Sequence, residues 1–156
     1  MKFYFKKSFL SSANYNVLDR FGQVVFTIEQ KEISLFPKFH IYDTEHNEIG
    51  LIKTKVDSNR LTFPVYINGR YIDYIYQEFE VLKPKLCVKG LCWIIDSSLT
   101  SNKFRIHLDG ETLATINKFN PTPGVPYEID IKYERDTIMV LAVVIALKCT
   151  YLKSRH

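Results

Sequence analysis

The stretch Ile138-Met-Val-Leu-Ala-Val-Val-Ile-Ala-Leu147 decides the fold, because every residue in it is apolar and no Gly, Pro, Asn or Ser follows before Lys153. As one strand, residues 136–151 would extend about 50 Å, whereas strands in globular proteins usually measure ~17–20 Å. As a helix, the same residues span about 24 Å, an ordinary length. The segment is therefore predicted to be a helix over about 137–151, which Asp136 or Thr137 can cap.

A helix that is apolar on every side must be surrounded by protein or by lipid. Ten apolar residues cover ~15 Å, about half of a bilayer's hydrocarbon core, so a membrane span is not expected. Strands wrapped around the helix would bury it completely, and they would also close the sheet and remove its edges. The segment therefore predicts a barrel with a buried helix along its axis.

The rest of the chain consists of short alternating segments with turn residues between them. In Tyr127–Ile131, for example, apolar and charged residues alternate, which places them on opposite faces of a sheet. Asn68-Gly69 and Asp109-Gly110 are strong signals for two-residue hairpin turns. The same test predicts strands near 2–9, 14–19, 23–30, 38–43, 48–56, 60–67, 70–79, 85–89, 91–96, 103–109, 112–118 and 127–133. The fold class is therefore mainly β, a closed antiparallel barrel of about twelve strands around the C-terminal helix.

Composition agrees with one folded domain over residues 1–156. The chain is 46% hydrophobic and 24% charged, which excludes a disordered tail or linker. Its net charge of +4 is far from the dense basic surface of a dedicated nucleic-acid binder. Three cysteines are an odd set and fit reduced thiols, and the N-terminal residues lack the apolar core of a secretory signal. A cytoplasmic protein is expected.

Motifs for catalysis and metal binding are missing from the sequence. It contains no Gly-x-Ser-x-Gly, Walker, Gly-x-Gly-x-x-Gly or His-Glu-x-x-His pattern. His40 and His46 flank Asp43, but one histidine belongs to a predicted strand and the other to a turn, so a metal site is not expected. No local feature lowers the thiol pKa of Cys87 or Cys92. The sequence therefore predicts a non-enzymatic protein without cofactor or metal.

Two basic pairs are the remaining candidates for a binding site. Lys53 and Lys55 share one face of the predicted strand 48–56, opposite Ile52, Thr54 and Val56, so both are expected to point outward.

The second pair, Lys83 and Lys85, lies with Lys89 around a strand edge broken by Pro84. Each Lys near an anionic membrane surface contributes about 1 kcal/mol. The competing interpretation is a solvated barrel wall on which Lys discourages edge pairing. Nucleic acid is not expected as a partner, because the aromatic residues are assigned mostly to core-facing strand positions rather than to a basic groove.

The order of several motifs resembles the LURP-one-related family, which belongs with the tubby C-terminal domains and the phospholipid scramblases. The motifs are Tyr15–Gly22 (YNVLDRFG), Ile41–Asp43 (IYD) with Glu48–Ile52 (EIGLI), Trp93, Ala114–Lys118 (ATINK), Tyr127–Ile131 (YEIDI) and Met139–Ala146 (MVLAVVIA). The resemblance covers nearly the whole chain, and it implies a closed twelve-strand barrel around a central hydrophobic helix. Lys148 stands where an Asp is expected, and the basic phosphoinositide loop of tubby-type domains has no clear counterpart.

A shared fold does not carry function with it. From the lipid-linked relatives and the lysine pairs we expect a peripheral module that binds anionic phospholipid headgroups through Lys53, Lys55, Lys83 and Lys85. Its partner would be an anionic membrane surface. The alternative is a protein–protein interaction or structural scaffold barrel with no lipid ligand, whose partner would be another protein.

Overall fold

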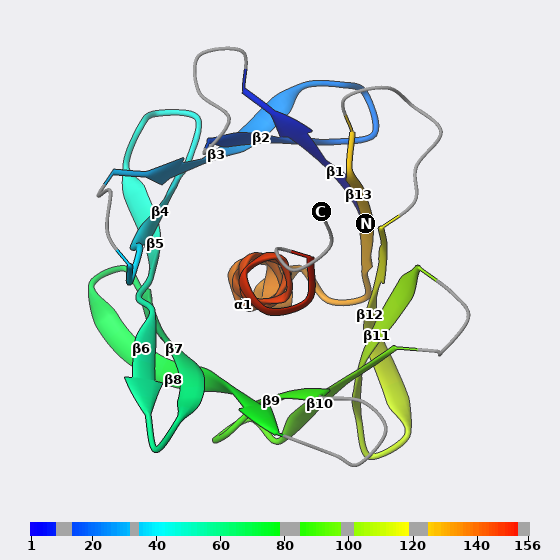
Figure 1. The fold of residues 1–156 in the computed structure, drawn as a ribbon. Helices are drawn as coiled ribbons and strands as arrows, with labels where there is room; N and C mark the ends of the chain where they lie inside the picture. The colour runs from blue at the N-terminus through cyan, green and yellow to red at the C-terminus, as the bar shows by residue number, and fades with distance from the viewer. Residues whose placement is uncertain (9–13, 32–34, 79–84, 98–101, 119–124, 153–156) are drawn as a thin grey trace.

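The computed structural model describes residues 1–8, 14–31, 35–78, 85–97, 102–118 and 125–152. Within these ranges the chain forms thirteen strands and one α-helix (Figure 1). The strands are β1 (Lys2–Lys7), β2 (Tyr15–Leu18), β3 (Val24–Gln30), β4 (Phe39–Tyr42), β5 (Glu48–Ile52), β6 (Lys55–Asp57), β7 (Arg60–Ile67), β8 (Arg70–Glu78), β9 (Lys85–Val88), β10 (Trp93–Ser97), β11 (Lys103–Leu108), β12 (Glu111–Asn117) and β13 (Tyr127–Ile131). A 3-10 turn (Glu134–Asp136) precedes helix α1 (Thr137–Leu147), and a π-helical turn (Lys148–Leu152) follows it.

Twelve of the described strands close into an antiparallel ring. Neighbours in sequence pair with each other from β1 to β5 and from β7 to β13, β1 pairs with β13, and β5 pairs with β7. β6 pairs with β7 beside this ring. The closed barrel predicted from the sequence is confirmed, as are the hairpin turns at Asn68-Gly69 and Asp109-Gly110, where all four residues have positive φ.

Helix α1 runs along the inside of the ring, as Figure 1 shows in a view down its axis. All nine residues from Met139 to Leu147 are buried, so the helix presents no polar face. In a barrel of eight strands, side chains alone can fill the interior. The ring of twelve strands is wider, and α1, about 10–12 Å across with its side chains, fills the additional space. The inner wall is lined by fully buried side chains, among them Val17, Ile28, Ile41, Ile52, Phe63, Ile75, Leu86, Ile106, Ile116 and Ile129.

The start of α1 differs from the predicted cap. Asp136 occupies the N-cap position, but its side chain makes no capping hydrogen bond. The Thr137 hydroxyl instead donates to the carbonyl oxygen of Glu134 at 2.7 Å, within the preceding 3-10 turn. Partial burial raises the pKa of the Asp136 carboxyl. The helix therefore begins from a tight turn rather than from a side-chain cap.

The predicted strand 48–56 is divided into β5 and β6, and Pro64 on β7 explains the division. The Pro64 carbonyl accepts the Lys53 amide at 3.0 Å, so its ring nitrogen, which has no hydrogen to donate, faces the same side. The paired strand therefore breaks there, and the Thr54 hydroxyl turns away to donate to the Pro37 carbonyl at 2.8 Å. Beyond the break, Val56 is 54% exposed, and the expectation that it points inward is wrong.

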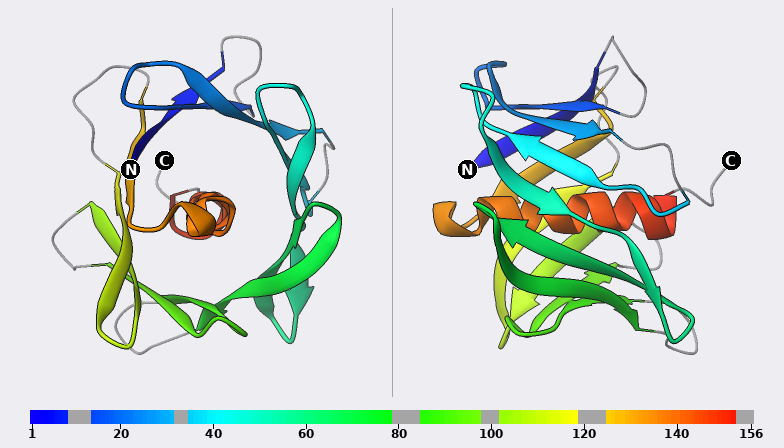
Figure 2. Two further views of the ribbon diagram at one scale, coloured as in Figure 1. Left: turned by 180° about the vertical axis from the view of Figure 1, so that it is seen from behind. Right: turned by 90° about the vertical axis from the view of Figure 1, so that its left-hand side faces the viewer.

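The two ends of the barrel differ in their connections (Figure 2). We call the end where α1 begins the entry end and the end where α1 ends the exit end. The turns between β2 and β3, β4 and β5, β7 and β8, β9 and β10, and β11 and β12 lie at the entry end. The β6–β7 hairpin, with its turn at Ser58 and Asn59, reaches the exit end.

Candidate functional site

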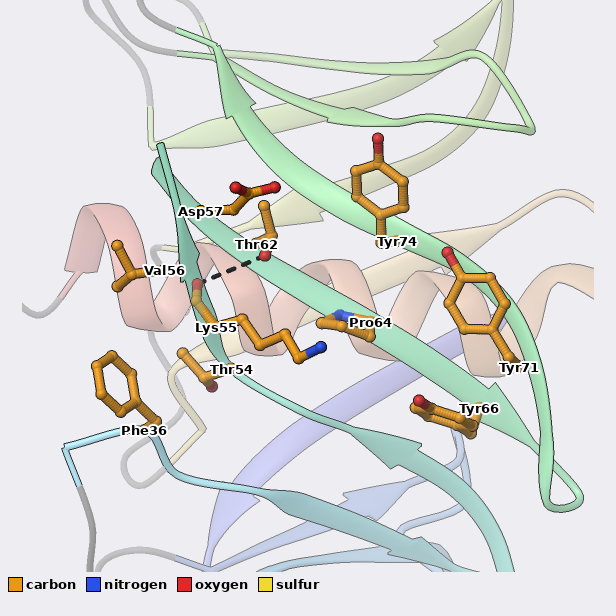
Figure 3. A pocket seen from close by; sticks show the side chains of 10 residues that line it. All are labelled: Phe36, Thr54, Lys55, Val56, Asp57, Thr62, Pro64, Tyr66, Tyr71 and Tyr74. Carbon is orange, nitrogen blue, oxygen red and sulfur yellow. Dashed lines mark hydrogen bonds between the residues drawn. The ribbon is translucent and has the colours of Figure 1, made fainter. Parts of the chain in front are cut away.

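A groove of about 810 Å³ lies on the outer wall of the barrel over β6, β7 and β8 (Figure 3). We call it the tyrosine groove. Its floor is formed by Thr62, Pro64 and Tyr66 of β7 and by Tyr71 and Tyr74 of β8, and its border by Phe36, Thr54, Lys55, Val56 and Asp57.

Tyr66 and Tyr74 face outward because they alternate with the buried Val65 and Ile75, and a bulge between Val65 and Tyr66 changes the register of the β7–β8 pair. Tyr66 thereby lies opposite Tyr71, with ring centroids 5.6 Å apart in an edge-on arrangement. Partial burial raises the pKa of the Tyr71 hydroxyl, and the nearby Asp73 carboxylate adds to the rise, so this hydroxyl stays protonated and able to donate at neutral pH.

These tyrosines correct the expectation that the aromatic residues are mostly core-facing. Phe63 and Trp93 are buried in the barrel, but Tyr66, Tyr71 and Tyr74 line a groove on its outside. Nucleic acid was not expected as a partner because the aromatic residues were assigned to the core, and this reason does not apply to the tyrosine groove. The absence of a nucleic-acid partner therefore stays a prediction. The signal that could have found the groove is the alternation of Tyr74 and Tyr76 with the buried Ile75.

Lys55 lines this groove, and Lys53, which is not part of its lining, contacts it through Tyr66. Lys55 is exposed, and its side chain runs alongside Pro64 toward the tyrosines (Figure 3). The Lys53 ammonium lies over the ring of Tyr66, 4.7 Å from its centroid, a contact that contributes about 0.5–1 kcal/mol at an exposed site. Two positive charges therefore stand at the groove together with tyrosine and threonine hydroxyls.

The other predicted pair is placed differently. Lys85 begins β9, where it lies opposite Glu78, and its ammonium is 3.9 Å from that carboxylate. It is absent from the lining of the tyrosine groove. Glu78 belongs instead to a neighbouring hollow of about 440 Å³, which also contains Arg60 and Lys89. Lys83 lies outside the described residues.

Charge is distributed unevenly between the ends of the barrel. Basic side chains predominate at the described strand ends near the exit end, where Lys6, Lys7, Lys31, Lys38, Lys55, Arg60, Lys85, Lys103 and Lys118 stand against Glu29, Asp57, Glu78 and Asp96. Acidic side chains predominate among the described residues near the entry end, where Asp19, Asp43, Glu45, Glu48, Asp73, Asp109, Glu111, Glu134 and Asp136 stand against Arg20, Arg70, Lys132 and Arg135. The tyrosine groove extends from Val56 and Asp57 at the basic end to Tyr71, which follows the β7–β8 turn of the entry end.

The histidines considered as metal ligands take part in other contacts. His40 is hydrogen-bonded to Glu48, and the His46 ring stacks on Tyr42 with centroids 4.4 Å apart. Asp43 accepts the backbone amides of Asn47 and Glu45, and these bonds hold its pKa below the usual value. The described part of the chain contains no group of three or more His, Cys, Asp or Glu side chains placed to hold a metal ion.

The cysteines differ in their exposure. Cys87 is buried, and this burial raises the pKa of its thiol, which disfavours the reactive thiolate. Cys92 is exposed in the β9–β10 turn, where its thiol contacts the Lys89 and Gly90 carbonyls at 3.8 Å.

No helix within the described ranges combines the length and the apolar character that crossing a bilayer requires.

Comparison with known proteins agrees with this architecture. The family model described as LURP-one-related matches residues 1–148. The chain belongs to the LURP-one-related family. A curated relative, the uncharacterised protein YxjI of Bacillus subtilis, is 27% identical over 143 residues, which cover 91% of this chain and 88% of YxjI. The X-ray structure of an Arabidopsis thaliana protein superposes with a TM-score of 0.68 at 10% identity, over 95% of this chain and 89% of that one, a likeness that shows the fold alone. The comparisons therefore establish the family and the fold of this LURP-one-related barrel. They do not indicate an activity, because the relative YxjI is itself uncharacterised.

Proposed function

We propose that this LURP-one-related barrel is a peripheral module that binds anionic phospholipid headgroups at the tyrosine groove. The observation that supports it is that Lys55 lines this groove and that the Lys53 ammonium lies over Tyr66, which lines the same groove. Lys85 on β9, and Lys83 outside the described residues, are the further headgroup contacts of this proposal.

The chemistry of the groove suits a phosphate group at a membrane surface. Lysine ammonium groups supply compact positive charges, and the hydroxyls of Tyr71 and Tyr74 supply hydrogen-bond donors. Two lysines near an anionic surface contribute about 2 kcal/mol together, or a factor of about 30 in affinity. Asp57 on the groove border opposes anions, and the net charge of the whole chain is only +4, so we expect a modest affinity.

Sedimentation with vesicles tests the proposal. The protein is mixed with vesicles of phosphatidylcholine alone or of phosphatidylcholine with phosphatidylserine, at salt concentrations of about 0.1 M and about 1 M. Exposed charges are screened beyond ~10 Å at the lower concentration and beyond ~3 Å at the higher one. We expect binding only to the anionic vesicles, and we expect it to weaken as the salt concentration rises.

A pair of charge-reversal variants makes this test specific. Lys53→Glu/Lys55→Glu should lower binding at least 30-fold, the factor estimated above for losing both lysines. Arg20→Glu/Arg70→Glu makes the same change in net charge with exposed residues of the entry end and should bind like the wild type. Circular dichroism confirms that both variants fold.

Two outcomes would favour the alternative, a protein-interaction or scaffold barrel. The first is equal recovery with neutral and anionic vesicles, and the second is no binding at low salt. Equal losses in both charge-reversal variants would show that net charge acts without a site.

A further inference from the structure

We propose that the barrel stands on the membrane with its exit end and that Leu35 and Phe36 enter the boundary between headgroups and acyl chains. This inference rests on the proposed function, and it adds the orientation of the barrel and the apolar contacts.

Exposed apolar side chains gather where the tyrosine groove meets the exit end. Leu35 is 91% exposed, and Phe36 and Val56, which border the same groove, are about half exposed. The hydrogen bond from the Thr54 hydroxyl to the Pro37 carbonyl attaches the segment that carries Leu35 and Phe36 to the junction of β5 and β6. Phe36 and Val56 therefore border the groove that Lys55 lines, and Leu35 directly precedes Phe36 in the chain.

Apolar exposure alone does not distinguish the two ends of the barrel. Phe21 in the β2–β3 turn is 72% exposed, and Ile72 and Leu91 are also exposed at the entry end. There, however, acidic side chains outnumber basic ones, and an anionic surface repels that end. The ring of Phe21 is also covered by the Arg20 guanidinium, 4.8 Å from its centroid.

Among the residues that the structure describes, only those of the exit end therefore combine apolar contacts with complementary charge. Peripheral proteins that bind membranes reversibly use these two contributions together, because buried apolar area and attraction to anionic lipid add to each other. The β6–β7 hairpin, which carries Lys55 and Val56, reaches this end on the barrel wall, at the level of the last turns of α1 along the barrel axis (Figure 2). With the exit end against the bilayer, the lysines meet headgroup phosphates while Leu35 and Phe36 reach deeper.

Serine variants of the two ends test this orientation with the vesicle assay. Leu35→Ser should lower binding to phosphatidylcholine–phosphatidylserine vesicles about tenfold or more, because it removes one membrane-buried apolar side chain. Phe21→Ser removes a larger exposed ring from the entry end and should leave binding unchanged. Both positions are largely exposed, so we expect both variants to fold like the wild type.

Tryptophan variants locate the inserted residues directly. The only tryptophan of the chain, Trp93, is buried in the barrel and supplies a constant background. In Leu35→Trp, the added fluorescence should shift to the blue on anionic vesicles and should be quenched by lipids brominated on their acyl chains. In Phe21→Trp, the added fluorescence should show neither change.

The results separate this inference from the proposed function. Wild-type binding to anionic vesicles with no quenching of the residue-35 tryptophan would overturn the orientation and leave headgroup binding standing. Quenching of the residue-21 tryptophan would place the opposite end on the membrane and overturn it as well. Absence of wild-type binding at low salt would overturn both.

Discussion

Placing a charge in the middle of α1 is the sharpest test of the fold. Val143 is completely buried between the helix and the barrel wall, and replacing it with Asp removes ~1.5–3 kcal/mol of apolar burial. Neutralising the carboxyl at pH 7 costs about 4 kcal/mol, at about 1.4 kcal/mol per pH unit above its unfolded pKa of about 3.9. Burying the neutral group without a partner costs about 1–3 kcal/mol more. Val143→Asp should therefore lose about 7–10 kcal/mol, as much as the whole stability of many domains.

The loss should depend on pH with a definite sign. Burial raises the pKa of an aspartic acid at position 143 in the folded state, so the unfolded state gives up its proton first as the pH rises. The destabilisation is therefore smallest near pH 4 and grows toward neutrality. Urea unfolding followed by circular dichroism and by the fluorescence of Trp93 measures it at both pH values.

Val56→Asp is the matched control, because the same chemical change is made at a residue that is 54% exposed. Its stability should change by about 0.5 kcal/mol or less. A soluble Val143→Asp protein whose unfolding midpoint at pH 7 lies close to that of the wild type would refute the buried central helix.

Three further substitutions test individual contacts. Burial of the hydroxyl, followed by the charge of the Cys149 thiolate, raises the pKa of Tyr15 from 10.0 to about 12, so its contribution to stability is complete below pH 10 and is lost as the pH rises toward 12. Between pH 10 and pH 12 the free energy of unfolding of Tyr15→Phe should therefore fall by about 2–3 kcal/mol less than that of the wild type, as measured by urea midpoints. The same pH dependence in both proteins would contradict the raised pKa of Tyr15. In Gly50→Ala the new methyl group would lie 3.1 Å from the Ile138 Cγ2 atom, and this crowding should lower the free energy of unfolding by about 1–3 kcal/mol. In a double-mutant cycle, Ile138→Ala should recover part of this loss. Strictly additive losses would argue against the contact. The Asp73 carboxylate accepts the backbone amides of Tyr74, Gly90 and Leu91 at 2.8–2.9 Å, so Asp73→Ala should cost about 3 kcal/mol or more, with faster hydrogen exchange at the β9–β10 turn. Asp73→Asn keeps one acceptor oxygen and should lose less, and equal losses in the two variants would show that these hydrogen bonds contribute little.

Local patterns predicted most of the barrel. The apolar run from Ile138 to Leu147 indicated a buried helix, because neither a strand nor an exposed helix accommodates ten consecutive apolar residues of that length. The two hairpin turns were also predictable, since Asn-Gly and Asp-Gly favour the positive φ that such turns require. The division of strand 48–56 was not predicted, because its cause is Pro64, which acts only through the pairing of two separate strands.

The candidate site was predicted in part. The alternation pattern marked Lys53 and Lys55 as outward-facing, but it could not place them beside Tyr66, because that contact depends on how β5, β6 and β7 pair. The outward position of Tyr66 follows the regular alternation of β7, whereas Tyr71 lies opposite it only because a bulge shifts the register of β8 against β7. The prediction grouped Lys85 with Lys53 and Lys55 as a headgroup contact. In the structure, Lys85 lies on β9, on the far side of β8 from the tyrosine groove, where it is opposite Glu78.

By itself, the sequence determined that this chain forms strands around a buried C-terminal helix, because hydrophobic period and segment length act within a few residues of one another. Only the tertiary structure decided that Phe36, Lys55 and Tyr71, which lie far apart in the chain, line one groove. It also decided that one end is basic and the other acidic. Antiparallel closure brings alternate strand ends to the same end of the barrel, so charges that are scattered along the sequence add up in space.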